Sequence, residues 1–434
     1  MAMPISSSSV ARIATKPFDG LVRSASRSCS IGKIHSDRRT RIPSIRADLI
    51  TEPDAFEVGR FVGSYGFMNI TSYSSFQSGG FSNANVFDEF SPGYSSEDME
   101  RLRVQDVGEG RVKIRLYEGR VIQGPLKGTR VIFKVYPGRR AGGVEADMMA
   151  ANELGTHVFL QLRCDLQSDS EKLCPNLQFL LGGFETKMGE QWLACRNDGK
   201  YSAADYGKSV SEANSKDTAK GENFWNPFTK EQKMKRRRIY VIKLLNGAMN
   251  GLAYMHDHDR LHQSLGPSSV VLNTMVEKDA SYLVPKLRDL SFSVDIGYSS
   301  LGAAQSTLSE GLWRRASAAG AFTPLEKRAY GIADDIYEAG LFFAYLAFIP
   351  FCEAGIIDII SLQRLFENTF QLDLQAVREY CLADDGLLEA VKFLDLGDGA
   401  GWELLQAMLN PDYRQRPIAE AVLNHRFMSL VNLL

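Results

Sequence analysis

The fold of this 434-residue chain is decided by residues 254–295, YMHDHDRLHQSLGPSSVVLNTMVEKDASYLVPKLRDLSFSVD. Two short apolar runs in this stretch, Ser269–Leu272 and Leu283–Leu287, have the length of strands and flank a polar turn. Before it, residues 239–255 carry apolar side chains at spacings of three and four, which predicts a helix. The expected order is a helix, a polar loop, a strand hairpin, and then the motif RDLS at 288–291.

This order resembles the catalytic region of protein kinases. In that family a His-Arg-Asp loop supplies the base that accepts the proton of the substrate hydroxyl, and an Asn and the Asp of Asp-Phe-Gly hold magnesium. Here the loop is HQSLGPSS at 262–269, and the second motif is Asp289-Leu290-Ser291. The resemblance implies a kinase frame in which Asp289 keeps the place of a metal ligand, while most of the other catalytic groups are missing.

The substitutions in the loop remove the groups that transfer phosphate. Ser264 occupies the position of the catalytic Asp, and a serine hydroxyl cannot accept a proton as a carboxylate does. Gly266 replaces the Lys that neutralises the γ-phosphate, and Ser269 replaces the Asn that holds the second metal. Gln263 replaces the Arg that pairs with a phosphorylated segment. His262 keeps the family position, where it is expected to be buried and bonded to backbone.

The residues before this region predict the small lobe of the same fold. Runs 112–119 and 128–136 are typical of strands, and Lys134 matches the strand lysine that pairs with the α- and β-phosphates of ATP. The expected partner of Lys134 is Glu153, 19 residues further on (153 − 134) in a helical pattern, with Glu145 as the second choice.

Only one glycine remains of the loop with which kinases cover the ATP phosphates. In the expected alignment Gly119 keeps its place and Val121 follows it, while Ile114 and Leu116 occupy the first two glycine positions. Side chains there keep the backbone amides away from phosphate oxygens. A phosphate loop must lie between two strands that deliver the lysine close behind. That role is therefore not assigned to the earlier glycines Gly59, Gly63 and Gly66.

The rest of the chain continues the kinase order. Strands are expected at 177–184 and 191–195, and residues 191–209 resemble the hinge of thylakoid-associated protein kinases. Residues 197–236 are polar and are expected to form an exposed insertion that leads into a basic run at 230–238. The Ser/Ala/Gly-rich residues 299–321 are expected to be a mobile activation segment.

Near the C-terminus the resemblance is most specific. Residues 323–326, Thr-Pro-Leu-Glu, occupy the place of the kinase Ala-Pro-Glu motif, and Asp335 opens an apolar pattern that resembles the central helix of the large lobe. Residues 404–428 match the kinase pattern before the last helix, with Arg416-Pro417 at its centre. By the resemblance, Arg416 is expected to form an ion pair with Glu326.

The expected fold class is α+β: a two-lobed protein-kinase-like fold with a small β-rich lobe, a large helical lobe and a disordered N-terminal extension. Residues 1–47 are expected to be a transit peptide and 48–103 an irregular extension rich in Gly, Ser and aromatic residues. The kinase-like domain is expected at 104–434, with the small lobe at about 104–196, the insertion at about 197–236 and the large lobe at about 237–434.

The composition and the N-terminal segment indicate where the protein is located and which kinds of partner it has. The net charge of −2 gives no reason to expect nucleic-acid binding. Residues 1–47 are rich in Ser and Arg with few acids, which favours a chloroplast address, in the stroma or at the thylakoid. No run is long and apolar enough for a membrane span, so any thylakoid contact is expected to be peripheral. The six cysteines are scattered and are expected to be free thiols.

These features predict a chloroplast pseudokinase that scaffolds or regulates another chloroplast protein. ATP and magnesium are expected to bind weakly or not at all, through Gly119, Val121, Lys134, Glu153 and Asp289, with Asp289 as the metal ligand. The first alternative is an atypical Ser/Thr kinase that uses another acid as base, with Asp257 and Asp259 as the nearest acids. The second is a structural subunit that works through residues 48–100.

Overall fold

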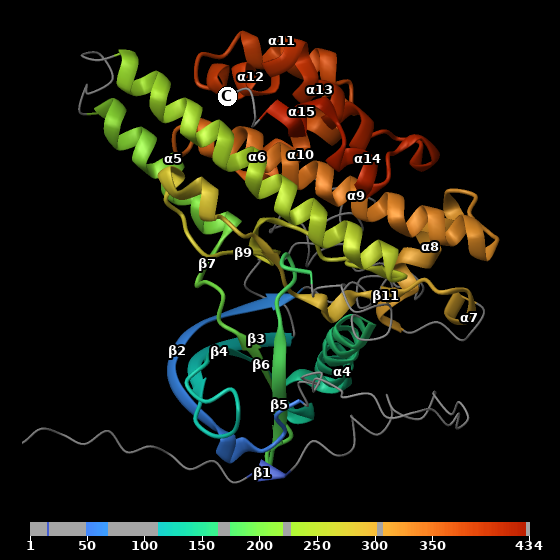
Figure 1. Cartoon of the computed structure of the whole chain (residues 1–434). Coiled ribbons are helices and arrows are strands. Elements are labelled where there is room, and N and C mark those ends of the chain that lie inside the picture. The colour runs from blue at the N-terminus through green and yellow to red at the C-terminus, as the bar shows by residue number, and fades with distance from the viewer. Residues whose placement is uncertain are drawn as a thin grey trace, which may run out of the picture. The chain divides into compact units, whose positions relative to one another are not determined.

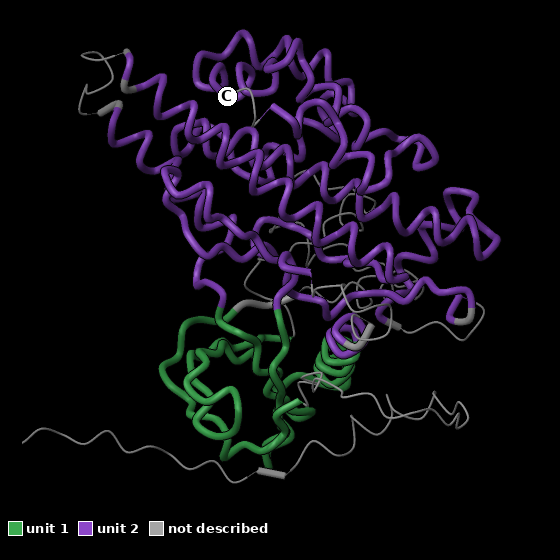
Figure 2. The backbone as a smooth tube through the Cα atoms, viewed as in Figure 1, with its two compact units in different colours: residues 1–67, 108–155, 179–197 green, residues 68–107, 156–178, 198–434 purple. Residues whose placement is uncertain are grey.

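The structure, a computed structural model, describes residues 15–16, 49–67, 112–163, 174–219, 227–301 and 307–430. It divides into two compact units, shown in Figure 2: residues 1–67, 108–155 and 179–197 form unit 1, and residues 68–107, 156–178 and 198–434 form unit 2. Most of the expected transit peptide and residues 68–103 of the expected extension lie outside the described residues. Unit 1 is built around a sheet and unit 2 mainly from helices, so the expected α+β class is confirmed (Figure 1).

Unit 1 contains one six-stranded sheet in the order β1-β5-β6-β4-β3-β2, in which all neighbours are antiparallel. The strands are β1 Thr15–Lys16, β2 Phe56–Phe67, β3 Val112–Val121, β4 Arg130–Tyr136, β5 Leu180–Thr186 and β6 Gln191–Arg196. Strand β2 was not expected, because residues 48–103 were predicted to be irregular. That prediction is wrong for residues 56–67, which pair with β3 and move the start of the sheet well before residue 104.

The two faces of strand β4 carry different chemistry. Val131, Phe133 and Val135 are fully buried in a cluster in which Phe133 meets the rings of Phe56, Phe184 and Trp192. Because side chains alternate along a strand, Lys134 and Tyr136 lie on the opposite face. Helix α4, Arg139–Arg163, follows β4 and contains the expected helical run, with a non-helical Gly143 (φ 66°) near its start.

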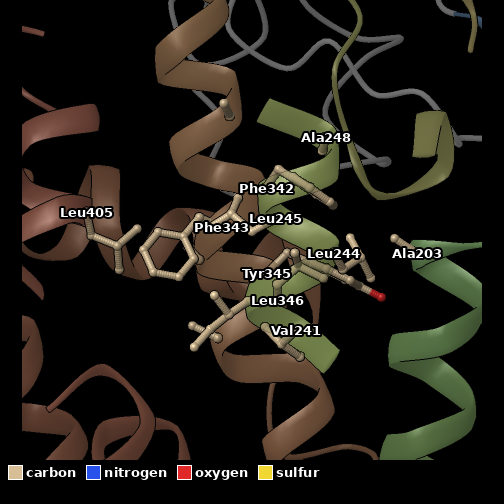
Figure 3. Close-up of a cluster of buried hydrophobic side chains, with 14 of the residues drawn as sticks. Ala203, Val241, Leu244, Leu245, Ala248, Phe342, Phe343, Tyr345, Leu346 and Leu405 are labelled. Carbon is tan, nitrogen blue, oxygen red and sulfur yellow. The ribbon is translucent and has the colours of Figure 1, made fainter. Parts of the chain in front are cut away.

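Unit 2 is organised around two long helices, α6 Pro227–Asp257 and α9 Pro324–Phe348. Figure 3 shows where apolar side chains of α6 (Val241, Leu245) meet those of α9 (Phe342, Leu346), and all four are 1% exposed or less. The remaining helices are α5 Ala203–Ala219, α7 Tyr298–Leu301, α8 Glu310–Ala318, α10 Ile359–Arg364, α11 Leu374–Leu382, α12 Leu388–Leu394, α13 Leu396–Met408, α14 Ala419–Leu423 and α15 Arg426–Ser429. Among the described residues, no helix has both the length and the apolar character that crossing a membrane requires.

Short strands of unit 2 frame the loop that decides the fold. They are β7 Tyr201–Ser202, β8 Arg260–Leu261, β9 Val270–Leu272, β10 Lys286–Leu287 and β11 Val294–Asp295. The expected hairpin is confirmed, because β9 and β10 pair antiparallel with Val271 opposite Lys286. Strands β8 and β11 pair on the other side of the loop, so residues 262–269 are fixed at both ends.

Helices lie in the segment that was expected to be an exposed insertion and in the segment that was expected to be mobile. Residues 197–236 were predicted to be an exposed insertion, but they contain β7, α5 and the first turns of α6. Part of the basic run in α6 is structural: Arg237 is 1% exposed and its Nε donates to Glu277 at 2.9 Å. The predicted mobile segment at 299–321 contains α8, whose Leu312 and Trp313 are buried in a core cluster.

Helix α9 begins earlier than expected and changes the role of Glu326. The helix starts at Pro324 and not near Asp335, and Thr323 and Glu326 form a capping box at its N-terminus. The predicted ion pair between Glu326 and Arg416 is wrong. Glu326 accepts from the backbone N–H groups of Phe322 and Thr323, whereas Arg416 donates to the carbonyls of Ala333 and Asn410.

Candidate functional site

In unit 1 the structure brings Lys134 and Glu153 together in a buried ion pair. Lys134 Nζ lies 2.6 Å from Glu153 Oε1 and 2.7 Å from Oε2, and the two side chains are 2% and 0% exposed. A charge buried in protein must be paired, since water no longer solvates it. Glu153, and not the second choice Glu145, is therefore the partner that α4 presents to β4.

Tyr136 is a third member of this cluster, and the sequence analysis did not identify it. Its hydroxyl donates to Glu153 Oε2, and the Lys134 ammonium lies 5.7 Å from the centre of its ring. The signal was present, because a residue two positions after Lys134 in a strand must point to the same face. Together the lysine and the tyrosine supply donors to both oxygens of the Glu153 carboxylate.

Gly119 and Val121 do not join Lys134. Gly119 lies where β2 and β3 approach closely: a Cβ atom there would come within 2.4 Å of Glu57 O and 2.5 Å of the Phe133 ring. Val121 is fully buried in the aromatic cluster on the face of the sheet opposite Lys134. Both residues pack the sheet in this structure, and their predicted part in nucleotide binding stays a prediction.

A different glycine lies in line with Lys134. Strand pairing sets Gly63 opposite Leu116 and Leu116 opposite Lys134, so the three residues form a row across β2, β3 and β4. Two strand spacings amount to about 10 Å. A Cβ atom at Gly63 would meet nothing within 4 Å, which leaves the backbone there open. The sequence analysis set Gly63 aside because the pairing of β2 with β3 could not be read from the local pattern.

In unit 2 the first residues of the loop 262–269 are held by one buried carboxylate, that of Asp335. Its oxygens accept from the backbone N–H of His262 at 2.7 Å, the N–H of Gln263 at 2.9 Å, the Gln263 side chain at 2.9 Å and His256 Nε2 at 2.9 Å. Asp335 is 0% exposed. His262 is fully buried and its Nε2 donates to the Arg288 carbonyl at 3.0 Å, as the expectation of a His bonded to backbone required.

The serine hydroxyls of the loop are used to hold the loop itself. Ser264 Oγ donates to the carbonyl of Asp289 at 2.7 Å and lies 3.4 Å from His262 Nδ1. Ser269 Oγ donates to the Gly266 carbonyl at 2.8 Å and accepts from the Gly266 N–H at 2.9 Å. At Ser264, which the sequence analysis aligned with a catalytic base, the chain therefore has a hydrogen-bond donor to backbone.

Asp289 is buried beside an arginine. Its backbone is left-handed (φ 69°, ψ 52°), its side chain is 3% exposed, and Arg288 Nε lies 3.4 Å from Oδ2. Within the described ranges, no group of three or more His, Cys, Asp or Glu side chains gathers as a metal site would. Magnesium takes near-octahedral oxygen ligands, and here Ser269 is already bonded to backbone while Asp289 faces a guanidinium. The described residues do not fit a divalent cation.

Other carboxylates near the loop differ in whether they are paired, exposed or in contact with the loop. Asp259, one of the two acids considered as a substitute base, accepts from Arg328 in an ion pair, and Asp257 is exposed at the end of α6. Glu338 in α9, which the sequence analysis did not consider, accepts from the Leu265 N–H at 3.3 Å. It is a carboxylate that contacts the loop directly beside Ser264.

Comparison with known proteins shows similarity among solved structures. No protein-family model matches the chain, and no curated protein matches it. Among solved structures, the chain is similar to one described as the crystal structure of a Stt7 homolog from Micromonas algae soaked with ATP. The TM-score is 0.48 at 16% sequence identity, and the match covers 92% of this chain and 97% of that one. We draw no conclusion about function from a similarity of this size.

Proposed function

We propose that this protein is a pseudokinase: a kinase-like protein that does not transfer phosphate and that acts as a scaffold or regulator of a partner protein. One observation carries the proposal. The side chain at the position of the catalytic base, Ser264, is a buried hydroxyl that donates its proton to the Asp289 carbonyl at 2.7 Å. A hydroxyl in this bond cannot take the proton of a substrate hydroxyl.

The size of the expected deficit follows from what the loop lacks. A positioned general base contributes about 10²–10⁴ to the rate. Gly266 offers no cation to the γ-phosphate, and Ser269 offers a hydroxyl that is already bonded to backbone. Phosphoryl transfer depends almost entirely on positioning and charge neutralisation. The loss of the other two groups should therefore reduce the rate below that expected from the lost base alone, although the effects do not simply add.

Lys134 and Glu153 are the residues that would still contact ATP. Their ion pair is formed, which is the arrangement that kinases require of this pair. However, the lysine is enclosed by Glu153 and Tyr136, so a phosphate must compete with an existing buried pair. We therefore expect ATP to bind weakly, and we expect Lys134→Ala to weaken that binding further.

The partner and the location follow from the chain outside the site. The Ser/Arg-rich residues 1–47 support a chloroplast address, in the stroma or in peripheral contact with the thylakoid. The partner is then another chloroplast protein. A kinase-like body that keeps its fold without its chemistry is suited to holding such a partner.

The proposal is tested by a phosphate-transfer assay with the full chain. We expect no transfer above background to a generic acceptor such as myelin basic protein, and no autophosphorylation, with either magnesium or manganese. Lys134→Ala and Asp289→Ala proteins, purified in the same way, measure transfer by contaminating kinases. Transfer by the wild type that disappears in both variants would overturn the proposal.

The second candidate function is an atypical kinase in which Glu338 acts as the base. The contact of Glu338 with the Leu265 N–H favours this residue over Asp257 and Asp259. If the wild type transfers phosphate, Glu338→Gln should abolish the transfer and Asp257→Asn, at an exposed position, should not. Equal activity of both variants would exclude Glu338 as the base.

A further inference from the structure

We infer that the cation at Asp289 is the guanidinium of Arg288, so that this site operates without a divalent metal ion. The inference deepens the proposed function, because it concerns the same site and states how an anionic ligand would be bound there. It starts from the disagreement between the predicted magnesium ligand and its surroundings.

Arg288 is held next to Asp289 from several sides. Its backbone N–H donates to the Ser269 carbonyl at 2.9 Å, and its own carbonyl accepts from His262 Nε2 at 3.0 Å. The Nε and Nη2 groups of its side chain donate to the Ser268 carbonyl at 3.0 and 2.8 Å. These contacts fix the guanidinium, so its 3.4 Å approach to Asp289 Oδ2 is part of the loop's construction.

The charges at this point are balanced without a metal. The Asp289 side chain is 3% exposed, so its negative charge needs a partner inside the protein. Arg288 supplies a permanent positive charge, because a guanidinium stays protonated at every accessible pH. A divalent cation that approached Asp289 would meet this charge at close range and would have to displace it.

The neighbouring groups do not offer a metal the ligands it would need. Magnesium requires several oxygen ligands at about 2.0–2.1 Å in nearly octahedral geometry. The hydroxyl at the position of the second metal ligand, Ser269, exchanges two hydrogen bonds with Gly266. The Nε and Nη2 groups of Arg288 are bonded to the Ser268 carbonyl, so it is the positive charge of Arg288 that can take over the electrostatic part of the metal's role toward a phosphate group.

The test uses Mn²⁺ alone as the probe, with the full chain and with electron paramagnetic resonance to measure the free ion. We expect the wild type to leave the Mn²⁺ signal unchanged at millimolar concentration. Arg288→Gln removes the charge and should raise Mn²⁺ affinity by about 10- to 100-fold, the range over which residues around a metal site alter affinity. Asp289→Asn added to Arg288→Gln should abolish the gain, and Arg288→Lys, which keeps the charge, should behave as the wild type.

Two outcomes would overturn the inference: Mn²⁺ binding by the wild type that Asp289→Asn removes, or no gain in Arg288→Gln while its circular dichroism matches the wild type. If Arg288→Gln fails to fold, the Mn²⁺ titration of the wild type still tests the inference. A separate thermal-shift titration with ATP, in EDTA and in magnesium, concerns the proposed nucleotide contact. An ATP shift that requires magnesium would contradict the inference, whereas absence of any shift would contradict only the nucleotide contact.

Discussion

At the scale of single residues, the cluster of Lys134, Glu153 and Tyr136 buries two charges, which costs solvation free energy, and holds them in place through hydrogen bonds. Both charged groups are buried, and removing either one takes from the other a charged partner at hydrogen-bonding distance. Removing one partner of a buried ion pair is more damaging than replacing both, because an uncompensated charge remains in a medium of low dielectric constant. The Tyr136 hydroxyl completes the set by satisfying a further lone pair of Glu153.

We predict that Glu153→Ala lowers the free energy of unfolding by about 3–5 kcal/mol, because it removes one partner of a buried ion pair and takes the Glu153 carboxylate away from the Lys134 ammonium. Tyr136→Phe should cost about 1–3 kcal/mol, since it removes one donor and leaves a carboxylate oxygen less satisfied. Urea titrations followed by tryptophan fluorescence measure both. Glu145→Ala, at the half-buried position that does not join the cluster, is the matched control and should change stability by about 0.5 kcal/mol or less. A control as damaging as Glu153→Ala would contradict this assignment.

Two buried thiols predict a dependence on pH. Burial raises the pKa of Cys352 and of Cys381 from 9.0 to about 12 each, with Asp384 adding to the effect. The native protein keeps protons that the unfolded chain releases above pH 9, so the free energy of unfolding should fall as the pH rises from about 9 to about 12. At pH 8 we expect iodoacetamide to label both thiols at least about 10³-fold more slowly in the native protein than in urea, from the thiolate fraction alone. Mass spectrometry of the labelled peptides measures this, and equal rates would refute it.

Not every residue of the site could be predicted from the sequence. Lys134 and Glu153 were predicted from the resemblance to kinases, in which a strand lysine pairs with a glutamate on the following helix. Arg288 was visible as a neighbour of Asp289, but its direction depends on the Ser268 carbonyl, which is 20 residues away. Gly63 was missed because its relation to Lys134 runs through two strand pairings and not through the local pattern.

At the scale of elements, the start of helix α9 shows how a local motif can be misassigned. Thr323-Pro324-Leu325-Glu326 has the chemistry of a capping box with proline in the first turn. These hydrogen bonds, first of all those from Thr323, lower the pKa of the Glu326 carboxyl. Arg416 stacks on Tyr337, with its guanidinium 4.6 Å from the ring centre, and bonds to two carbonyls. Glu326 and Arg416 therefore stabilise helix α9 through separate contacts.

This separation predicts additive effects of mutation. Thr323→Ala should reduce stability by about 0.5–2 kcal/mol through loss of the cap. Glu326→Ala and Arg416→Ala, made singly and together, should give effects that sum to within about 0.5 kcal/mol, since the two side chains share no contact. Thermal or urea unfolding of the wild type, Glu326→Ala, Arg416→Ala and the double variant gives the double-mutant cycle. A coupling energy between Glu326 and Arg416 clearly above that limit would instead support the ion pair that was predicted from the sequence.

The elements that the sequence predicted well are those with strong periodic patterns. The spacing of apolar residues at 239–255 gives α6, and the two apolar runs after the loop give β9 and β10. Strand β2 could not be predicted in the same way, because its glycines and aromatic residues do not alternate and its partner β3 lies beyond residues 68–111. Helix α8 was missed because its small residues look like a loop until Trp313 and Leu312 are seen to be buried.

At the scale of the whole molecule, the chain combines a sheet-based unit with a mainly helical unit, and the proposed function rests on three positions of one loop, at which the resemblance to kinases implies missing catalytic groups. Each missing group is replaced by a side chain or a glycine that fits the loop: Ser264 and Ser269 bond to backbone, and Gly266 lies between them. The two serine hydroxyls of the loop are thus engaged with its own backbone.

The expected chloroplast address can be tested independently of the site. We predict that residues 1–60 fused to a fluorescent reporter direct it into chloroplasts, because the Ser/Arg-rich, acid-poor composition of residues 1–47 is that of a transit peptide. Confocal microscopy of plant cells measures the outcome, with the reporter alone as control. A reporter that remains in the cytosol or enters the secretory pathway would contradict the prediction.

The position of Asp335 also has a consequence for the order in which the protein can assemble. This carboxylate fixes the backbone of His262 and Gln263, yet it lies 73 and 72 residues later in the chain. During synthesis, the backbone N–H groups of His262 and Gln263 lack this acceptor until residue 335 has been made and α9 has formed. Contacts over such separations form slowly, because the intervening chain must first be closed into a loop. We therefore expect the catalytic-loop region to be among the last parts of unit 2 to become protected from hydrogen exchange during folding.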